Sequence, residues 1–264
     1  MLRFCCLASG SSGNATLIEA TDGLQRTRVL IDCGLGWRQL LQRLAQQQLD
    51  IQDIDAVFIT HEHGDHVGCA PLLHVRHGIA LHTSAGTWQA LHQASGHLHT
   101  PTAPSPPARD GLMLRIGALG LLPFTVPHDA REPLQLRCTD GDRVLGILTD
   151  LGHVTPHALR QLAGCHALLL ESNHDPALLA TSAYPLFLKR RVAGAHGHLS
   201  NAQAAQALAH LQHPGLNIVV AAHLSERNNH PDLVRAALST TLGCAPQEVL
   251  LANRHGLAAG WLTA

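Results

Sequence analysis

The stretch "AVFITHEHGDHVG", residues 56–68, decides how the rest of the sequence is interpreted. An apolar run typical of a buried strand is followed directly by three histidines and two acidic residues. On an extended turn, His61 and His63 can point toward one cation, and the glycine after them lets Asp65 and His66 face a second. Imidazole and carboxylate ligands suit Zn²⁺, Mn²⁺ or Fe. The stretch therefore predicts a metal-binding loop at the C-terminal end of a strand.

Three other strand-like runs end in residues that can bind metals. "LLPFTVPHDA" ends at His128, "VLGILTD" at Asp150 and "NIVVAAH" at His223. A carboxylate such as Asp150 can bridge two cations, while the two histidines can complete one site each. Because the chain contains 21 histidines, a single strand-end histidine is often only a capping or surface residue. Taken together, the residues predict a dinuclear metal site formed by His61, His63, Asp65, His66, His128, Asp150 and His223.

The rest of the chain alternates short apolar runs with helical patterns, which indicates an α/β layered fold. At 264 residues, the chain is most simply one domain over positions 1–264. Strands are expected at 2–7, 15–19, 29–32, 56–60, 121–126, 144–149, 167–171, 218–222 and 248–251. Helices are expected at 37–48, 87–94, 201–211 and 231–242. The proline-rich segment "HTPTAPSPPARDG", residues 99–111, is expected to be an exposed connection.

The composition excludes several classes of protein. The chain is 45% hydrophobic and 14% charged, which is typical of a folded rather than a disordered chain. No apolar run reaches the length of a membrane span, so we expect a cytoplasmic protein that has no membrane partner. The net charge of −1 gives no overall basic surface for binding nucleic acid.

Among the seven cysteines, Cys33 and Cys69 flank the metal motifs, and both are expected to be packing residues.

Several motifs resemble those of the metallo-β-lactamase superfamily along essentially the whole chain. "THEHGDH" is similar to its signature loop, "VPHDA" to its third ligand, "LTDLG" to its bridging aspartate and "AAHLSERNN" to its last histidine. "LIDCG" resembles its first motif, which implies that Asp32 orients a ligand from behind. The resemblance implies a single-domain, four-layer αβ/βα sandwich.

More narrowly, "LASGSSGN", "ESNHD", "GHLSN" and "HLSERNN" resemble the YycJ/WalJ-type branch of nuclease-like metallohydrolases, which are relatives of RNase J and tRNase Z. The chain departs from RNase J because it has no room for that enzyme's additional nucleic-acid-binding domain. His63 stands where flavodiiron relatives have glutamate, which argues against oxygen or nitric oxide redox chemistry.

A pair of divalent ions, Zn²⁺ or Mn²⁺, implies hydrolysis by a hydroxide that bridges them, so no serine or cysteine nucleophile is needed. Asp65 would hold the second ion and orient the hydroxide. His198 lies just before a helix that Ser200 caps, and it could donate a proton to the leaving group or a hydrogen bond to the substrate. The positive end of that helix would favour a phosphate. The alternative for His198 is an incidental place in an ordinary capping box.

Other polar residues are candidates for substrate contacts. "SGSSGN" could bring Ser11 and Asn14 to the mouth of the cleft, although a plain turn explains it equally well. Asn173 and His174 follow a strand and could reach the cleft, but His174 could also be structural. Ser200 could contact a phosphate.

The sequence favours a metal-dependent phosphodiesterase that trims nucleic acid from an end, of the 5′–3′ exonuclease type. One alternative is a small-molecule hydrolase that cleaves a cyclic phosphodiester, thioester or lactam, and the near-neutral charge fits that alternative. A non-enzymatic metal-binding protein is disfavoured, because the set of ligands is complete. DNA or RNA preference, the native metal and the oligomeric state are open.

Overall fold

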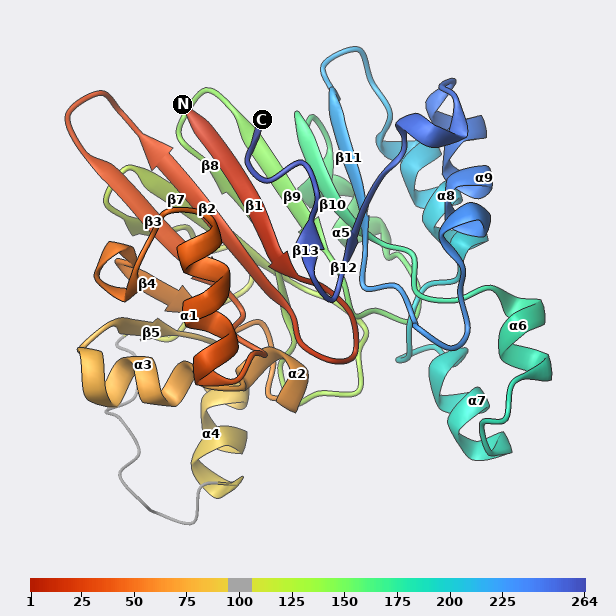
Figure 1. Ribbon diagram of the computed structural model, residues 1–264, viewed down its shortest axis with the longest axis horizontal. Helices are drawn as coiled ribbons and strands as arrows, with labels where there is room; N and C mark the ends of the chain where they lie inside the picture. The colour runs from red at the N-terminus through yellow and green to blue at the C-terminus, as the bar shows by residue number, and fades with distance from the viewer. Residues whose placement is uncertain (95–105) are drawn as a thin grey trace.

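In the computed structural model, which describes residues 1–94 and 106–264, the strands form two sheets (Figure 1). The first sheet has the order β14-β1-β2-β3-β4-β5. Its strands are β1 (Leu2–Ala8), β2 (Ala15–Thr21), β3 (Arg26–Ile31), β4 (Ala56–Phe58), β5 (Ala80–His82) and β14 (Leu262–Thr263). Strands β3, β4 and β5 run parallel, so the segments that follow β3 and β4 emerge at the same edge.

The second sheet has the order β13-β12-β11-β10-β9-β8-β7-β6. Its strands are β6 (Leu114–Ile116), β7 (Leu119–Thr125), β8 (Leu134–Thr139), β9 (Val144–Leu148), β10 (Ala167–Glu171), β11 (Ile218–Ala222), β12 (Leu250–Asn253) and β13 (Gly256–Leu257). Strands β9 to β12 are parallel, and the residues that follow β9, β10 and β11 therefore share one edge.

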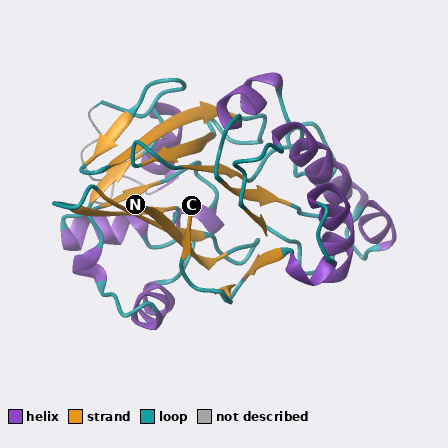
Figure 2. Ribbon diagram, turned by 90° about the horizontal axis from the view of Figure 1, so that it is seen from above, coloured by secondary structure: helices purple, strands orange, loops and turns teal. Residues whose placement is uncertain are grey.

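Helices cover the outer face of each sheet (Figure 2). The first sheet is covered by α1 (Trp37–Gln46), α3 (Ala70–His77) and α4 (Ala85–Ala94), and the second by α5 (Pro156–Leu162), α8 (Asn201–Leu211) and α9 (Pro231–Leu242). Three short helices, α2 (Gly64–Val67), α6 (Pro176–Thr181) and α7 (Leu186–Val192), lie in the connections. Within the described ranges, no helix has both the length and the apolar character needed to cross a bilayer.

Alternation along the strands creates three apolar layers. In β1, Leu2 and Phe4 point into the core between the sheets, while Cys5 and Leu7 point toward the helices. Strand β10 alternates in the same way between the central core and the layer beneath its own helices. Because both faces of these strands are buried, they appear in the sequence as continuous apolar runs. The predicted four-layer αβ/βα sandwich is confirmed.

Most of the strands that the sequence-based expectations missed are short. Strands β5, β6, β13 and β14 are two or three residues long, too short for a clear alternation. Strand β8 alternates visibly, as "LQLRCT", but was not predicted. The strand expected from residue 248 begins at Leu250, because a 3₁₀ turn occupies Pro246–Glu248; another lies at Ile51–Asp53. The expected connection over 99–111 lies partly outside the described residues.

Cys33 and Cys69 are both buried, and their sulfur atoms are 3.4 Å apart. All seven cysteines are free thiols in this structure, and six of them are buried. This agrees with the expected packing role of Cys33 and Cys69.

A buried ion-pair cluster joins three neighbouring strands. The carboxylate of Glu19 on β2 is 1% exposed and accepts hydrogen bonds of 2.7 Å from Arg3 on β1 and from Arg28 on β3. Since the Arg28 side chain is only 10% exposed, removing the carboxylate would leave a largely buried guanidinium with one partner fewer.

We therefore expect Glu19→Gln to lower the free energy of unfolding by about 3 kcal/mol, measured by urea denaturation. Glu226→Gln is the control, because Glu226 pairs with Arg254 at 3.7 Å and both side chains are more than half exposed. That substitution should change stability by less than about 1 kcal/mol. Equal losses in the two variants would contradict the importance of the buried cluster.

Candidate metal centre

The site lies where the C-terminal ends of parallel strands from both sheets meet. Asp32 follows β3, His61 lies shortly after β4, Asp150 lies just beyond β9 and His223 follows β11. Asp32, Asp150 and His223 have φ angles of 58°, 55° and 55°. The left-handed conformation costs a residue that has a Cβ about 1 kcal/mol or more. The turns after β3, β9 and β11 are thus locally unfavourable, and the surrounding packing must hold them.

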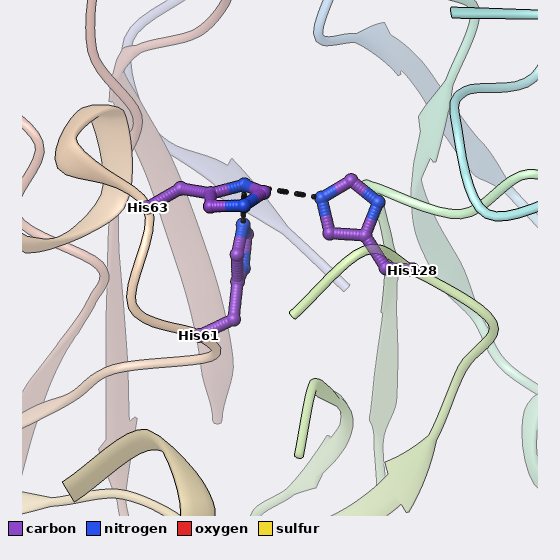
Figure 3. A group of neighbouring side chains, drawn as sticks. All are labelled: His61, His63 and His128. Carbon is purple, nitrogen blue, oxygen red and sulfur yellow. Dashed lines mark hydrogen bonds between the residues drawn. The ribbon is translucent and has the colours of Figure 1, made fainter. Parts of the chain in front are cut away.

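Three imidazoles converge on one point (Figure 3). His61 Nε2 is 3.1 Å and His128 Nε2 is 3.3 Å from His63 Nδ1. Metal–nitrogen bonds of about 2.1 Å in a tetrahedral arrangement require ligand nitrogens about 3.4 Å apart. The three nitrogens therefore have a spacing that suits one shared cation.

The outer nitrogens of two of these rings have hydrogen-bond acceptors. The Thr60 hydroxyl donates to Asp32 and so accepts from His61 Nδ1 at 3.0 Å. His128 Nδ1 donates to the carbonyl of Gly197 at 3.2 Å. Both Nε2 atoms are then left with a free lone pair. Burial lowers the pKa of His128 and, together with the charge of His66, holds the pKa of His61 well below its usual range, so both rings are neutral.

A second group forms around Asp150. Its Oδ2 lies 3.4 Å from His66 Nε2 and belongs to a ligand cluster with His61 and His66. Asp65 Oδ2 lies 3.6 Å from both His66 Nε2 and His223 Nε2. Asp150 is thus placed between the two groups, where its carboxylate can contact ions in both.

Two buried atoms in this second group are unsatisfied. Asp150 Oδ2 and His223 Nε2 have no hydrogen-bond partner among the described residues. A buried polar atom without a partner costs about 1–3 kcal/mol, so a ligand is the expected explanation. Burial raises the pKa of Asp150, but His223 and His66 outweigh it and hold that pKa well below its ordinary value. An ionised carboxylate beside imidazole nitrogens fits the binding of divalent cations.

Two acids fix the orientation of the histidines from behind. Asp32 Oδ2 contacts His66 Nδ1 at 2.7 Å, which leaves the Nε2 of His66 facing the site. Glu171, at the end of β10, accepts from His223 Nδ1 at 2.8 Å and from His198 Nδ1 at 2.9 Å. Burial raises the pKa of Glu171, but His198 and His223 outweigh it and hold it at about 2. Glu171 is therefore ionised and positions two imidazoles at once.

The sequence-based prediction missed Glu171. Its signal was the same as that of Asp150, an acid at the end of a buried apolar run, "ALLLE". Asn173 and His174, the residues predicted from this motif, follow it directly.

The metal-binding loop is not the extended turn that was expected. His63 is the N-cap of the short helix α2, and Asp65 and His66 lie on its first turn. The helix is held against the loop after β3, where a Cβ on Gly34 would lie 1.7 Å from the carbonyl oxygen of Asp65. A glycine at position 34 is thus required for the close approach that places Asp65.

A cavity of about 370 Å³ opens onto the site. His63, Asp65, Asp150, His198 and His223 line it, as do Ser11 and residues of α7. The bond from His198 Nδ1 to Glu171 leaves the other ring nitrogen of His198 available toward the cavity.

Four of the five candidate substrate contacts are not among the residues that line this cavity. Asn14 is 9% exposed, and its side-chain amide contacts Asp65 Oδ2 at 3.3 Å and His66 Nε2 at 3.1 Å, so it packs beside the ligands. Asn173 donates to the carbonyl of His223 at 2.9 Å and is 3% exposed. His174 is also 3% exposed. In the described part of the chain, only Ser11 of the five candidates lines the cavity.

Most of the N–H groups at the N-terminus of α8 are already bonded, whereas free groups were expected there for a phosphate. The Ser200 N–H donates to the side chain of Gln203, whose own N–H donates back to the Ser200 hydroxyl. The Asn201 N–H donates to the carbonyl of His174 at 2.9 Å. Ser200, at 6% exposure, is therefore a helix cap, and His198 reaches the cavity independently of the helix end.

Comparison with known proteins agrees with this geometry. Residues 27–223 match the β-lactamase superfamily domain. The chain is 32% identical to exodeoxyribonuclease YycJ of Bacillus anthracis, over 91% of this chain and 89% of that protein. It is 30% identical to exodeoxyribonuclease WalJ of Streptococcus pneumoniae, over 92% of this chain and 89% of that protein.

Among solved structures, the metallo-β-lactamase fold protein YhfI from Bacillus subtilis superposes with a TM-score of 0.69 at 15% identity. The match covers 96% of this chain and 97% of that one, and it shows that the fold is shared. The chain belongs to the metallo-β-lactamase superfamily and, within it, to the family of YycJ and WalJ.

Proposed function

We propose that this chain is a metal-dependent phosphodiesterase that binds two divalent cations and removes nucleotides from an end of DNA. The observation that carries the proposal is the pair of ligand groups that meet at Asp150, with its buried, unpartnered Oδ2 atom. His61, His63 and His128 would hold one ion, and Asp65, His66 and His223 the other, with Asp150 between them. The number of ions and their identity, Zn²⁺ or Mn²⁺, are part of the proposal.

Bound divalent cations would activate water at neutral pH and offset negative charge on the phosphate oxygens. The chain's own groups would supply position and protons. Asp65, whose side chain is 24% exposed and lines the cavity, is placed to accept a hydrogen bond from the attacking water. His198, fixed at Nδ1 by Glu171, is placed to donate a proton to the leaving oxygen from its other ring nitrogen.

Nucleic acid is the proposed substrate because YycJ and WalJ, relatives that match most of the chain, are named exodeoxyribonucleases. Lys189 and Arg190 lie on α7, which forms part of the cavity wall, and this positive charge supports a phosphate-rich substrate despite the net charge of −1. Cleavage from the 5′ end and a cytoplasmic location stay predictions.

The proposal predicts metal-dependent shortening of end-labelled DNA. Purified chain should contain about two divalent ions per molecule by elemental analysis, and should release mononucleotides from one end of labelled single or double strands. Asp150→Asn should lose at least one ion per chain and more than about 10³-fold in activity, because the shared carboxylate would lose its charge.

Asp142→Asn is the matched control, since Asp142 is exposed in the turn that precedes β9. It should keep both ions and full activity. A fully loaded wild-type chain that cleaves cyclic phosphodiesters, thioesters or lactams but no oligonucleotide would replace this proposal with the small-molecule hydrolase.

Glu171 is proposed as a positioning residue, which makes a separate prediction. Glu171→Gln should lower the affinity for Zn²⁺ or Mn²⁺ by about 10–100-fold, because a neutral amide supports the His223 ring less well than a carboxylate. Competition with a chromogenic chelator measures this affinity. Glu226→Gln, on an exposed surface, is the control. An unchanged affinity in Glu171→Gln would contradict the proposed role.

A further inference from the structure

The aromatic residues of this chain are unusually distributed. The sequence contains four phenylalanines and one tyrosine. Phe4, Phe58 and Phe124 are fully buried, whereas Phe187 is 73% exposed. The single tyrosine, Tyr184, lies three residues before Phe187 and lines the cavity of the metal centre. An exposed phenylalanine beside a catalytic cavity gains nothing from the core and is therefore available for a ligand.

Helix α7 connects this aromatic pair to the site. Leu188, Arg191 and Val192 line the cavity at helical spacing, so one face of the helix forms part of its wall; Tyr184, two residues before the helix begins, lines it as well. Phe187 directly precedes Leu188 and lies four positions before Arg191, beside that face. Figure 1 shows α6 and α7 standing apart from the sheets, at the lower right.

The helix is nevertheless fixed to the site at its C-terminal end. Arg191 Nε donates to Asp129 Oδ2 at 2.6 Å, and Asp129 Oδ1 lies 3.5 Å from His128 Nε2. The His198 N–H donates to the carbonyl of Val192 at 2.9 Å. A ligand bound to α7 would therefore have a fixed position relative to the proposed metal ligand His128 and the proposed proton donor His198.

Positive charge accompanies the aromatic rings. Lys189, Arg190 and Arg191 occupy the last turn of α7, and the Arg227 guanidinium lies 6.0 Å from the centre of the Tyr184 ring. Arg190 is exposed and forms no ion pair within the described ranges. In a chain whose net charge is −1, this local excess of cations beside exposed aromatic rings fits a nucleic-acid strand, which offers phosphates and stacking surfaces together.

We propose that helix α7 and Tyr184 form the binding surface for an unpaired strand that leads into the metal centre, with Phe187 stacking on a base and Arg190 and Arg227 contacting phosphates. The inference rests on the proposed nuclease function and adds that the substrate strand is unpaired when it reaches the metal centre. Stacking on Phe187 requires a base that is not paired, so this surface selects a single strand or a frayed end over an intact duplex. Arg191 is already paired to Asp129 and helps to hold the helix.

Kinetics with the metal-loaded enzyme test the inference. Phe187→Ala should raise KM for a short end-labelled single strand by about 5- to 100-fold, the range seen when one stacked aromatic is removed. Phe187→Trp should keep KM near the wild-type value. Leu24→Ala is the control, because Leu24 is fully exposed on the turn between β2 and β3. Leu24→Ala should also hydrolyse thymidine 5′-p-nitrophenyl phosphate at the wild-type rate.

A second variant tests the electrostatic part. Arg190→Ala should reduce the slope of log KM against log salt by about 0.7 for a single strand, which corresponds to one phosphate contact. An unchanged slope would show that Arg190 does not contact a phosphate of the bound strand.

The outcomes separate the two proposals. If wild-type enzyme trims DNA but Phe187→Ala has the wild-type KM for single strands, the binding surface is wrong and the nuclease function stands. If Phe187→Ala instead abolishes binding to phosphatidylserine vesicles while strand kinetics are unchanged, the helix is a membrane contact and the inference is overturned. If the loaded wild-type enzyme cleaves no nucleic acid, the proposed function fails and this inference fails with it.

Discussion

The carboxylate of Asp150 is the group on which the whole site depends. It is 2% exposed, its Oδ1 lies 3.4 Å from His223 Nδ1, and its Oδ2 lies 3.4 Å from His66 Nε2 without a hydrogen bond. An ionised group at that depth is tolerable only when positive charge surrounds it. The N–H edges of the neighbouring imidazoles carry part of that positive potential, and Asp32 and Glu171 fix how those imidazoles are turned. The carboxylate requires further positive charge, which makes this centre a candidate binding site for cations.

The two-sheet architecture explains why these groups meet. Parallel strands deliver their C-terminal residues to one edge, so β3 and β4 of the first sheet bring Asp32 and the His61 loop together. Strands β9, β10 and β11 of the second sheet do the same for Asp150, Glu171 and His223. The apolar core between the sheets, with Leu2, Phe4 and Phe58 from the first sheet, holds the two edges at contact distance. Burial of that core therefore supports the unfavourable φ angles at the strand ends.

The sequence was most informative where chemistry and chain position coincide. A residue able to bind a metal can be recognised when it follows an apolar strand, because the strand fixes where its end lies, and the seven proposed ligands, from four such segments, do lie in overlapping clusters. Glu171 also lies at the end of an apolar strand, but it was missed because a glutamate at a strand end is common on protein surfaces as well. Asn14, Asn173 and Ser200 were expected at the substrate because they lie in polar motifs. Their side chains instead satisfy backbone groups or contact the proposed ligand residues. Whether such a side chain points inward or toward the substrate is decided by packing, which the sequence does not show. The short helix α2 was missed because four residues carry no periodicity.

The proposed ligands come from opposite halves of the molecule: His61, His63, Asp65 and His66 belong to the first sheet's connections, and His128, Asp150 and His223 to those of the second. An ion at this seam would tie the halves together as well as serve chemistry. An ion present at a hundred times its dissociation constant adds about 2.7 kcal/mol to folding stability. Scarcity of divalent ions would therefore lower the folding stability of the chain as well as its activity. A less stable chain is more readily cleaved by proteases, so the supply of the ion would also influence the lifetime of the protein.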